Sequence, residues 1–275
     1  ALALYEQLGD AETVGRICWE LCDQLNWAGR WPESLETAHR GLAAVGEGAS
    51  RYRCRLLALA GCIEGLLGRY APAERLTAEA LQMSEELGDE RLQGEALMYR
   101  TLVDLCFVQV RESAAGGARA ADLLRSAGSL WDLCATLHFS GSADLWLGHL
   151  SDADAIGREL EPLAARLGHL GALVFARRYL AYINLMRTGD IDAFHQFAEA
   201  DLELCRTAPM PWISDSYLYL GLANFWRGRW EEALEHFKDA VDLETPGFLA
   251  GSEWSRLLLA RAYAGATSEA NAMLR

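Results

Sequence analysis

The sequence contains very little lysine, little proline and no long hydrophobic run. Lys238 is the single lysine among 25 basic residues, so we expect no Walker-type phosphate loop and no Schiff-base chemistry elsewhere in the chain. With only 6 prolines and 51% hydrophobic residues in 275, the chain is too apolar to be disordered. A signal peptide and a transmembrane segment are also lacking, which predicts a cytoplasmic protein without a membrane partner.

Positive charge is scarce as well, because the formal net charge is −14 at pH 7. Direct nucleic-acid binding needs a basic stripe that neutralises phosphates, so we expect no nucleic-acid partner. The six histidines are scattered and form no H-E-x-x-H or Ser/His/Asp arrangement. The sequence therefore predicts no catalytic residues, and we expect that the chain is not an enzyme.

Cysteine pairs of the metal-binding or redox type are absent. The seven cysteines form no C-x-x-C pair, and their number is odd, which favours free thiols in a reducing compartment. Cys18 and Cys22 lie four residues apart and could in principle share a metal ion, but no His or further Cys nearby in sequence completes a tetrahedral set. We interpret both as packing residues and predict no metal and no cofactor.

What the sequence does contain is glycine at a regular spacing of about forty residues, which indicates a repeat architecture. Each glycine ends an apolar-periodic segment of helical length, where glycine enters the left-handed conformation without a Cβ penalty. Two interleaved ladders result. They comprise Gly9, Gly48, Gly88, Gly128 and Gly168, and Gly29, Gly68, Gly148, Gly189, Gly228 and Gly265, with Val108 filling one gap.

Two helices per step predict an all-α, right-handed α-solenoid of about seven antiparallel helical hairpins. The repeat continues without a linker, so we expect residues 1–275 to form a single domain. The segment YEQLGD at 5–10 matches SEELGD at 84–89, the end of a second helix. Both ends of the chain thus cut through repeats, and we expect a fragment of a longer multidomain protein.

Local patterns give three further expectations. Small residues such as Ala233 should lie where the second helix crosses the first, with Gly221 allowing the close approach. Asp10 and Asp89 follow turn glycines and should cap the next helix. Residues 111–120, which contain two interior glycines after Val108, should be soft or irregular and could form a hinge between two rigid halves.

The steps resemble the tetratricopeptide repeat. The sixth step shows this best, since residues 217–221 read YLYLG and residues 228–233 read GRWEEA, similar to the opening, the turn and the second helix of that motif. The segment EELGDERLQGEA at 85–96 is similar to arrays in large bacterial signalling proteins, namely ATPase-type transcription activators and adenylate cyclases. The step of about forty residues exceeds the 34 residues of the motif.

The resemblance implies that the first helix of each repeat lines a concave groove. In its frame Asp23 faces that groove, and Trp27, Trp146 and Trp226 occupy equivalent positions. A row of indoles indicates either burial against neighbouring helices or anchors for a ligand, and the sequence leaves both open. The predicted groove residues are Trp19, Trp27, Met98, Leu102, His138, Trp146, Tyr179, Arg187, Trp226 and Tyr263.

Two classes of function remain. The first is a non-catalytic binding module of a bacterial signalling or transcription regulator, in which the groove takes a protein, a peptide or another domain of the same polypeptide. The alternative is a sensor in which a small metabolite controls an attached ATPase, cyclase or DNA-binding domain. An open, charge-rimmed groove would favour the first, and a pocket with converging polar groups around aromatic residues would favour the second.

Overall fold

The computed structural model describes residues 2–208 and 211–243, together with residues 257, 259–261, 263 and 265. In this part of the chain the regular structure is entirely helical, with no strand. The predicted all-α fold is confirmed. The helices are α1 (Leu2–Leu8), α2 (Ala11–Trp27), α3 (Trp31–Val45), α4 (Arg51–Leu66), α5 (Tyr70–Leu87), α6 (Glu90–Cys106), α7 (Val110–Ser126), α8 (Leu130–Leu147), α9 (Leu150–Leu167), α10 (Leu170–Thr188), α11 (Ile191–Thr207), α12 (Ile213–Trp226) and α13 (Trp230–Asp242).

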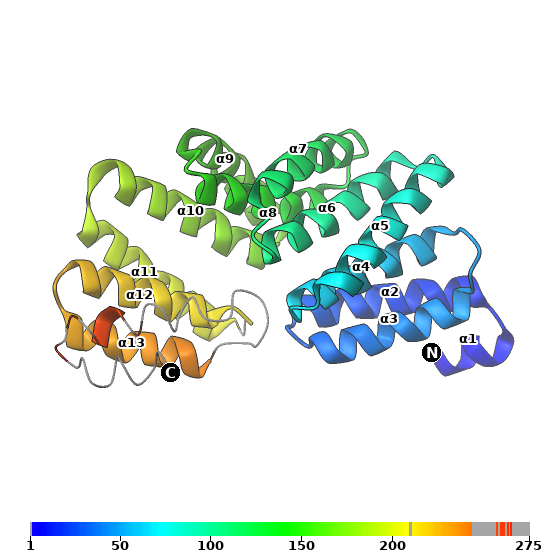
Figure 1. Cartoon of the computed structure of the whole chain (residues 1–275), viewed down its shortest axis with the longest axis horizontal. Helices are drawn as coiled ribbons and strands as arrows, with labels where there is room; N and C mark the ends of the chain where they lie inside the picture. Colours follow the sequence, from blue (N-terminus) through cyan, green and yellow to red (C-terminus); the bar gives the residue numbers. More distant parts are fainter. Residues whose placement is uncertain are drawn as a thin grey trace. The chain divides into compact units, whose positions relative to one another are not determined.

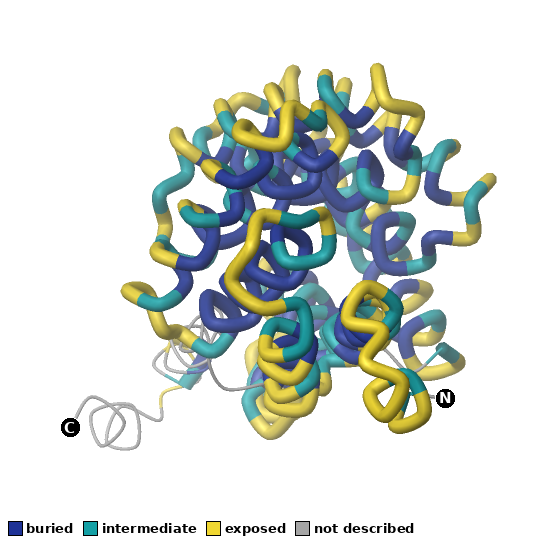
Figure 2. Tube along the Cα trace, turned by 90° about the vertical axis from the view of Figure 1, so that its right-hand side faces the viewer, coloured by how far each residue is buried: buried dark blue, intermediate teal, exposed yellow. Residues whose placement is uncertain are grey.

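Consecutive helices pair as hairpins, and the hairpins stack into a solenoid. Helix α2 packs on α3, α4 on α5, α6 on α7 and α8 on α9, and the first helices of these hairpins pack on one another in the order α2, α4, α6, α8 (Figure 1). Buried positions lie on the facing sides of the helices and exposed positions on their outer sides (Figure 2). This is the arrangement in which each repeat buries its apolar face against its neighbours.

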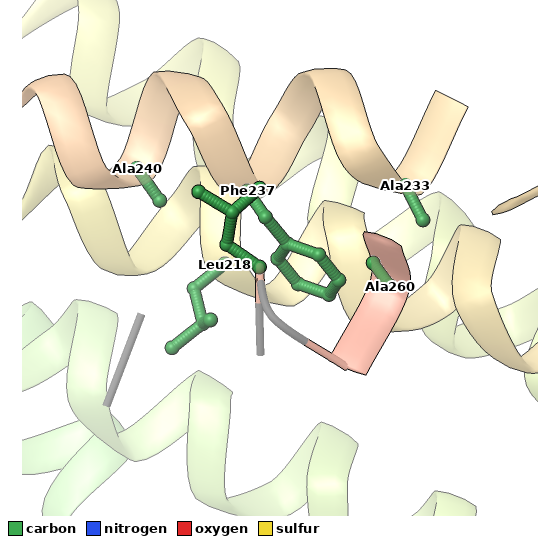
Figure 3. Packing of buried hydrophobic residues seen from close by; sticks show 6 residues of the cluster. Leu218, Ala233, Phe237, Ala240 and Ala260 are labelled. Carbon is green, nitrogen blue, oxygen red and sulfur yellow. The ribbon is translucent and has the colours of Figure 1, made fainter. Parts of the chain in front are cut away.

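The chain divides into two compact units, Ala1–Tyr179 and Leu180–Arg275, with the division inside α10. Unit 1 contains the hairpins from α2 to α9, and unit 2 contains α11, α12 and α13. In unit 2, the apolar cluster of Phe237 and Leu218 is buried around the small residues Ala233, Ala240 and Ala260 (Figure 3).

The turn glycines are confirmed by their backbone angles, with one correction. All the ladder glycines except Gly48 have positive φ, between 63° and 80°. After α3 it is Gly46, with φ of 73°, that takes the left-handed region, because the helix ends at Val45 and the turn comes two residues earlier than predicted. Val108, which fills the gap in the ladder, adopts the same conformation with φ of 60°. A β-branched residue is strained there.

The predicted crossings are confirmed. Ala233 is fully buried, and a Cβ added to Gly221 would lie 2.5 Å from the Phe237 ring. The caps are confirmed too. The Asp10 carboxylate accepts from the Thr13 N–H, and that of Asp89 accepts from two N–H groups in the first turn of α6. These local features position the helices of the solenoid.

The expected irregularity at residues 111–120 is not found, because α7 runs unbroken from Val110 to Ser126. The two glycines serve packing. Gly117 is buried, and a Cβ added there would lie 2.6 Å from the Cβ of Ser140 on α8. The close contact between α7 and α8 offsets the low helix propensity of glycine. The division between the two units also lies elsewhere, inside α10.

Candidate binding site on the inner helices

The ten predicted groove residues differ in how far the fold buries them. Trp146, Arg187, Trp226 and Tyr263 are exposed, whereas Trp19 and Trp27 are half-buried. The side chains of four others are buried, which corrects the expectation that they face an open groove. They are Met98, Leu102, His138 and Tyr179.

The first helices of the hairpins, α2, α4, α6 and α8, together with α10, are called the inner helices here. Contacts between these inner helices explain part of this burial. The Tyr99 hydroxyl of α6 reaches a carboxylate oxygen of Asp23 on α2 at 3.3 Å, past the intervening α4. The Tyr179 hydroxyl donates to the carbonyl of His138 on α8 at 2.5 Å and lies 2.7 Å from the Ser142 hydroxyl. Tyr179 therefore joins α8 to α10.

Trp146 is the most exposed of the predicted groove residues in unit 1. Met98, Leu102 and Tyr179 are buried in contacts between helices. Arg187 belongs to unit 2, whereas Trp146 belongs to unit 1. Trp146 itself, on the last turn of α8, keeps 43% of its surface exposed. Its exposure satisfies the condition for an anchor.

A second group of side chains, which we call the inner-face cluster, gathers where the inner helices of unit 1 meet. Its members come from four helices and one turn. They are Trp19, Asp23 and Trp27 of α2, Arg55 of α4, Arg91, Glu95 and Tyr99 of α6, Trp131 and Asp132 of α8, and His169 before α10.

A buried ion pair forms one side of the cluster. The Arg55 guanidinium donates to both carboxylate oxygens of Glu95, each at 2.6 Å, and both side chains are less than a tenth exposed. Arg91 adds a contact of 2.9 Å to Glu95, and the Arg55 guanidinium lies 4.3 Å from the centre of the Trp19 ring. Two-point pairing of this kind fixes both charged groups in place.

Two further carboxylates lie in the cluster with weaker compensation. Burial is the main cause that raises the pKa of Asp23, to about 6, and the negative charge of Asp132 adds to it. Burial also raises the pKa of Asp132, together with the charge of Glu95. Hydrogen bonds from Tyr99 and Trp27 to Asp23 act in the opposite direction. The site therefore carries excess negative charge at neutral pH.

Aromatic rings line the other side. His169 stacks on Trp131 with ring centres 4.1 Å apart and meets Trp27 edge-on at 4.8 Å. Burial lowers the pKa of His169 to about 4, so its imidazole is neutral at pH 7. Trp131 remains 43% exposed although α8 is buried from Leu133 to Gly141. The cluster is thus partly accessible.

Sequence reasoning placed Trp19, Asp23 and Trp27 on this face but missed the partners that other helices supply. The available signal was charge within apolar surroundings, since Arg55 precedes the apolar run LLALAG and Glu95 stands between Gly94 and Ala96. A charged residue at such a position is buried with a partner or belongs to a site. The sequence does not show which residue is the partner.

Two groups of side chains in the described residues have the composition of metal ligands. Cys18 and Cys22 are buried, and burial raises the pKa of Cys22 to about 12, which keeps the thiol protonated. At the turn between α8 and α9, Asp144, His149 and Asp152 place their ligand atoms within 4.8 Å of one another. The contact of 3.2 Å between His149 and Asp144 closes that turn and accounts for their proximity.

Comparisons with known proteins bear on the fold. No protein-family model and no curated protein matches the chain. Among solved structures, aspartyl phosphate phosphatase F from Bacillus subtilis superposes with a TM-score of 0.64 at 14% identity, over 85% of this chain and 60% of that one. A signal-transduction ATPase with a tetratricopeptide repeat sensor, from Pyrococcus horikoshii, gives 0.60 at 14% identity, over 96% of this chain and 41% of that one. A tetratricopeptide repeat protein from Parabacteroides merdae gives 0.55 at 14% identity, over 94% and 95%.

The fold is a tetratricopeptide-like helical array. At these identities the likeness concerns the architecture alone, and this array spans less than two thirds of the phosphatase chain and of the ATPase chain. Within the described residues, no helix of the array is long and apolar enough to cross a membrane.

Proposed function

We propose that the array is a non-catalytic binding module of a bacterial signalling or transcription regulator. Its partner is a protein, a peptide or another domain of the same polypeptide, bound by the inner helices of the array. One observation carries the proposal: α8, whose residues from Leu133 to Gly141 are all buried, keeps Trp131 and Trp146 each 43% exposed near its two ends.

Exposed tryptophans on a rigid, buried helix have the properties of binding anchors. They offer a large apolar surface at a low cost in side-chain entropy, and such residues dominate binding energy at interfaces. Resemblance in fold to a phosphatase of aspartyl phosphate and to an ATPase sensor supports the regulatory setting.

The inner-face cluster supports the alternative function as a metabolite sensor. Converging polar groups beside aromatic rings are typical of small-ligand sites. Binding of a metabolite there would bias the packing of α2 against α6 and α8, and an attached catalytic or DNA-binding domain would respond to the change.

The test is selection of binders from a random peptide-display library on the purified chain. We expect Trp146→Ala to weaken the selected peptides by about 2 kcal/mol, roughly thirtyfold in Kd, because a central aromatic anchor is removed while the helix stays folded. Trp230→Ala is the matched control, since Trp230 is 38% exposed at the start of α13 in unit 2.

Circular dichroism verifies that both variants fold. If the selected peptides bind Trp146→Ala and wild type equally, Trp146 is not an anchor. If no peptide is selected and a metabolite screen by thermal shift gives a ligand instead, the sensor alternative replaces the peptide-binding proposal.

A further inference from the structure

We propose that the inner-face cluster is a receptor for a basic side chain, a guanidinium or ammonium group, carried by a peptide ligand. This inference rests on the proposed function as a peptide-binding module and names the chemistry that the module recognises. Three features of the cluster support it: unbalanced charge, indole surfaces suited to a cation and a buried donor with no acceptor.

The first feature is the charge balance. Glu95 is neutralised by the two-point contact with Arg55 and by Arg91. Asp132 accepts a hydrogen bond from the Ser129 hydroxyl, and the charges of Arg91, 3.8 Å away, and of Arg55 act against the rise in its pKa. Among the contacts that the structure describes for Asp23, the donors are the Tyr99 hydroxyl and the Trp27 indole, both neutral. Two guanidinium groups thus face three carboxylates, and Asp23 has no cationic partner among these contacts.

A half-buried carboxylate without a counter-charge is costly, and a cation relieves that cost. Asp23 and Asp132 come from different helices, α2 and α8, which meet through the ring contacts of His169 with Trp27 and Trp131, and the charge of Asp132 contributes to the raised pKa of Asp23. A guanidinium placed between them would donate to both. At neutral pH a cation from a ligand is better suited than a bound proton to balance the charges of Asp23 and Asp132.

The second feature is the aromatic surface beside these carboxylates. Trp131 precedes Asp132 on α8 and is 43% exposed, and Trp27 lies one turn beyond Asp23 on α2. Inside the cluster, an indole already accepts a guanidinium, since Arg55 lies over Trp19. Indole faces attract cations through the ring quadrupole, and most strongly where water is excluded.

The third feature is His169, which is 2% exposed and has a polar atom with no protein partner. Its Nδ1 accepts from the Ala172 N–H at 3.3 Å, so the neutral ring carries its proton on Nε2. Nε2, at the far edge of the ring from the backbone, has no acceptor. The ring contacts both Trp27 and Trp131. A buried donor of this kind is unfavourable until an acceptor arrives.

A basic residue within a peptide carries both missing partners, and its carbonyl reaches the buried His169 Nε2–H when the exposed Trp131 ring that stacks on His169 is displaced. Its side chain provides the cation for Asp23 and Asp132, and its backbone carbonyl provides the acceptor for the His169 Nε2–H. A free amine or guanidine provides only the first. Peptide and free cation therefore share one chemistry at the carboxylates and differ at His169, which lets an experiment separate them.

The test uses three acetylated and amidated nonapeptides with the same glycine and serine flanks and Arg, Met or Glu at the central position. Calorimetry at low ionic strength measures their binding to the full chain, and argininamide serves as the free cation. We expect the Arg peptide to bind at least about tenfold more tightly than the Met and Glu peptides and than argininamide.

The variants are Asp23→Asn and Asp132→Asn, which keep the shape of each side chain and remove its charge. Each substitution should raise the Kd of the Arg peptide at least about tenfold and leave the Kd of the Met peptide unchanged. Asp122→Asn is the matched control, because the Asp122 side chain on α7 is 83% exposed and lies outside the cluster. Thermal melts confirm that the variants fold.

Equal binding of the Arg and Met peptides, or an unchanged Kd in Asp23→Asn, overturns the inference. So does the absence of Arg-peptide binding up to about 5 mM, which corresponds to a free energy of only about −3 kcal/mol. Argininamide that binds as tightly as the peptide would reassign the site to a free cation. Peptides selected by display that depend on Trp146 but not on Asp23 would leave the proposed function standing and reject this site.

Discussion

The interiors of the two units are built from different chemistry on the same hairpin architecture. In unit 1, side chains from α2, α4, α6 and α8 bring Asp23, Arg55, Glu95 and Asp132 together among aromatic rings. In the described part of unit 2 the interior is mainly apolar, with Phe194 packed against Phe197 and Tyr219 and with Phe237 buried over Gly221, and its buried carboxylate, Asp201, accepts a hydrogen bond from the buried Ser216 hydroxyl. The difference separates what holds the array together from what gives it a ligand.

Apolar clusters stabilise a fold without specifying a partner, at about 25 cal/mol for each Å² of apolar surface buried. Buried charges add little net stability, but they can specify a partner. Their desolvation offsets most of the attraction between them, so replacement by apolar residues of similar volume is often neutral or stabilising. The inner-face cluster therefore contributes little net stability, and its positions suit recognition of a ligand.

The largest effect is expected from the apolar side of this comparison. Phe237→Ala should lower the free energy of unfolding of unit 2 by about 3–5 kcal/mol, because it removes a fully buried ring and leaves a cavity beside Gly221. Chemical denaturation followed by circular dichroism measures the loss. A change below about 1 kcal/mol would show that the cluster around Phe237 is not a core.

On the charged side, single and double substitutions should differ. Glu95→Gln leaves the Arg55 guanidinium buried without its counter-charge and should cost about 3 kcal/mol. The double variant Arg55→Met with Glu95→Met should lie within about 1 kcal/mol of wild type, since both charges of the pair are removed together and neither is left buried without the other. Urea unfolding of the three proteins tests this. A double variant as unstable as Glu95→Gln would mean that the pair is a net stabilising element.

Asp23 should give the chain a pH-dependent stability of its own. Its pKa is raised to about 6 in the folded state, so between about pH 4 and 6 the folded chain binds more protons than the unfolded chain, and stability falls as pH rises. Burial is the main cause of the raised pKa, the charges of Asp132 and Glu95 add to it, and hydrogen bonds from Tyr99 and Trp27 oppose it.

Asp23→Asn removes the loss of stability that accompanies ionisation of Asp23. It should raise the free energy of unfolding at pH 7 by about 2 kcal/mol. The melting temperature measured from pH 4 to pH 8 should then decline less in the variant than in wild type. Parallel curves for the two proteins would contradict the burial of the Asp23 charge.

The smallest effect concerns a turn. Val108→Gly should stabilise unit 1 by about 0.5–1 kcal/mol, because relief of the left-handed strain exceeds the extra entropy of the unfolded chain. Gly148→Val, at the corresponding turn after α8 with φ of 77°, should destabilise by a similar or larger amount. Thermal unfolding of both variants compares the turns. A destabilised Val108→Gly would mean that packing of the valine side chain outweighs its strain.

How far the sequence predicts each feature depends on how local the feature is. The turns, the caps at Asp10 and Asp89 and the small residues at crossings such as Ala233 are confirmed, because each depends on a few neighbouring residues with a fixed backbone requirement. The irregularity predicted at residues 111–120 is wrong, since helix propensity was outweighed by the packing of Gly117 against Ser140.

The candidate site also has features that are local in sequence and features that are not. Spacing of four residues places Trp19, Asp23 and Trp27 on one face of α2, and this depends on helix geometry alone. The neighbours of that face depend on the angles at which successive hairpins pack. These angles bring Tyr99 to Asp23 and His169 to Trp27. They also bury Met98 and Leu102 while leaving Trp146 exposed.

The sequence by itself therefore determined a helical array with known turns, and it determined the face of each helix on which a residue stands, because both follow from local backbone geometry. Only the tertiary structure decided which distant faces meet, which of the predicted groove residues are buried, and that Arg55 pairs with Glu95 forty positions away. The physical reason is that solenoid curvature sums many small packing angles between side chains, and no local sequence pattern encodes that sum.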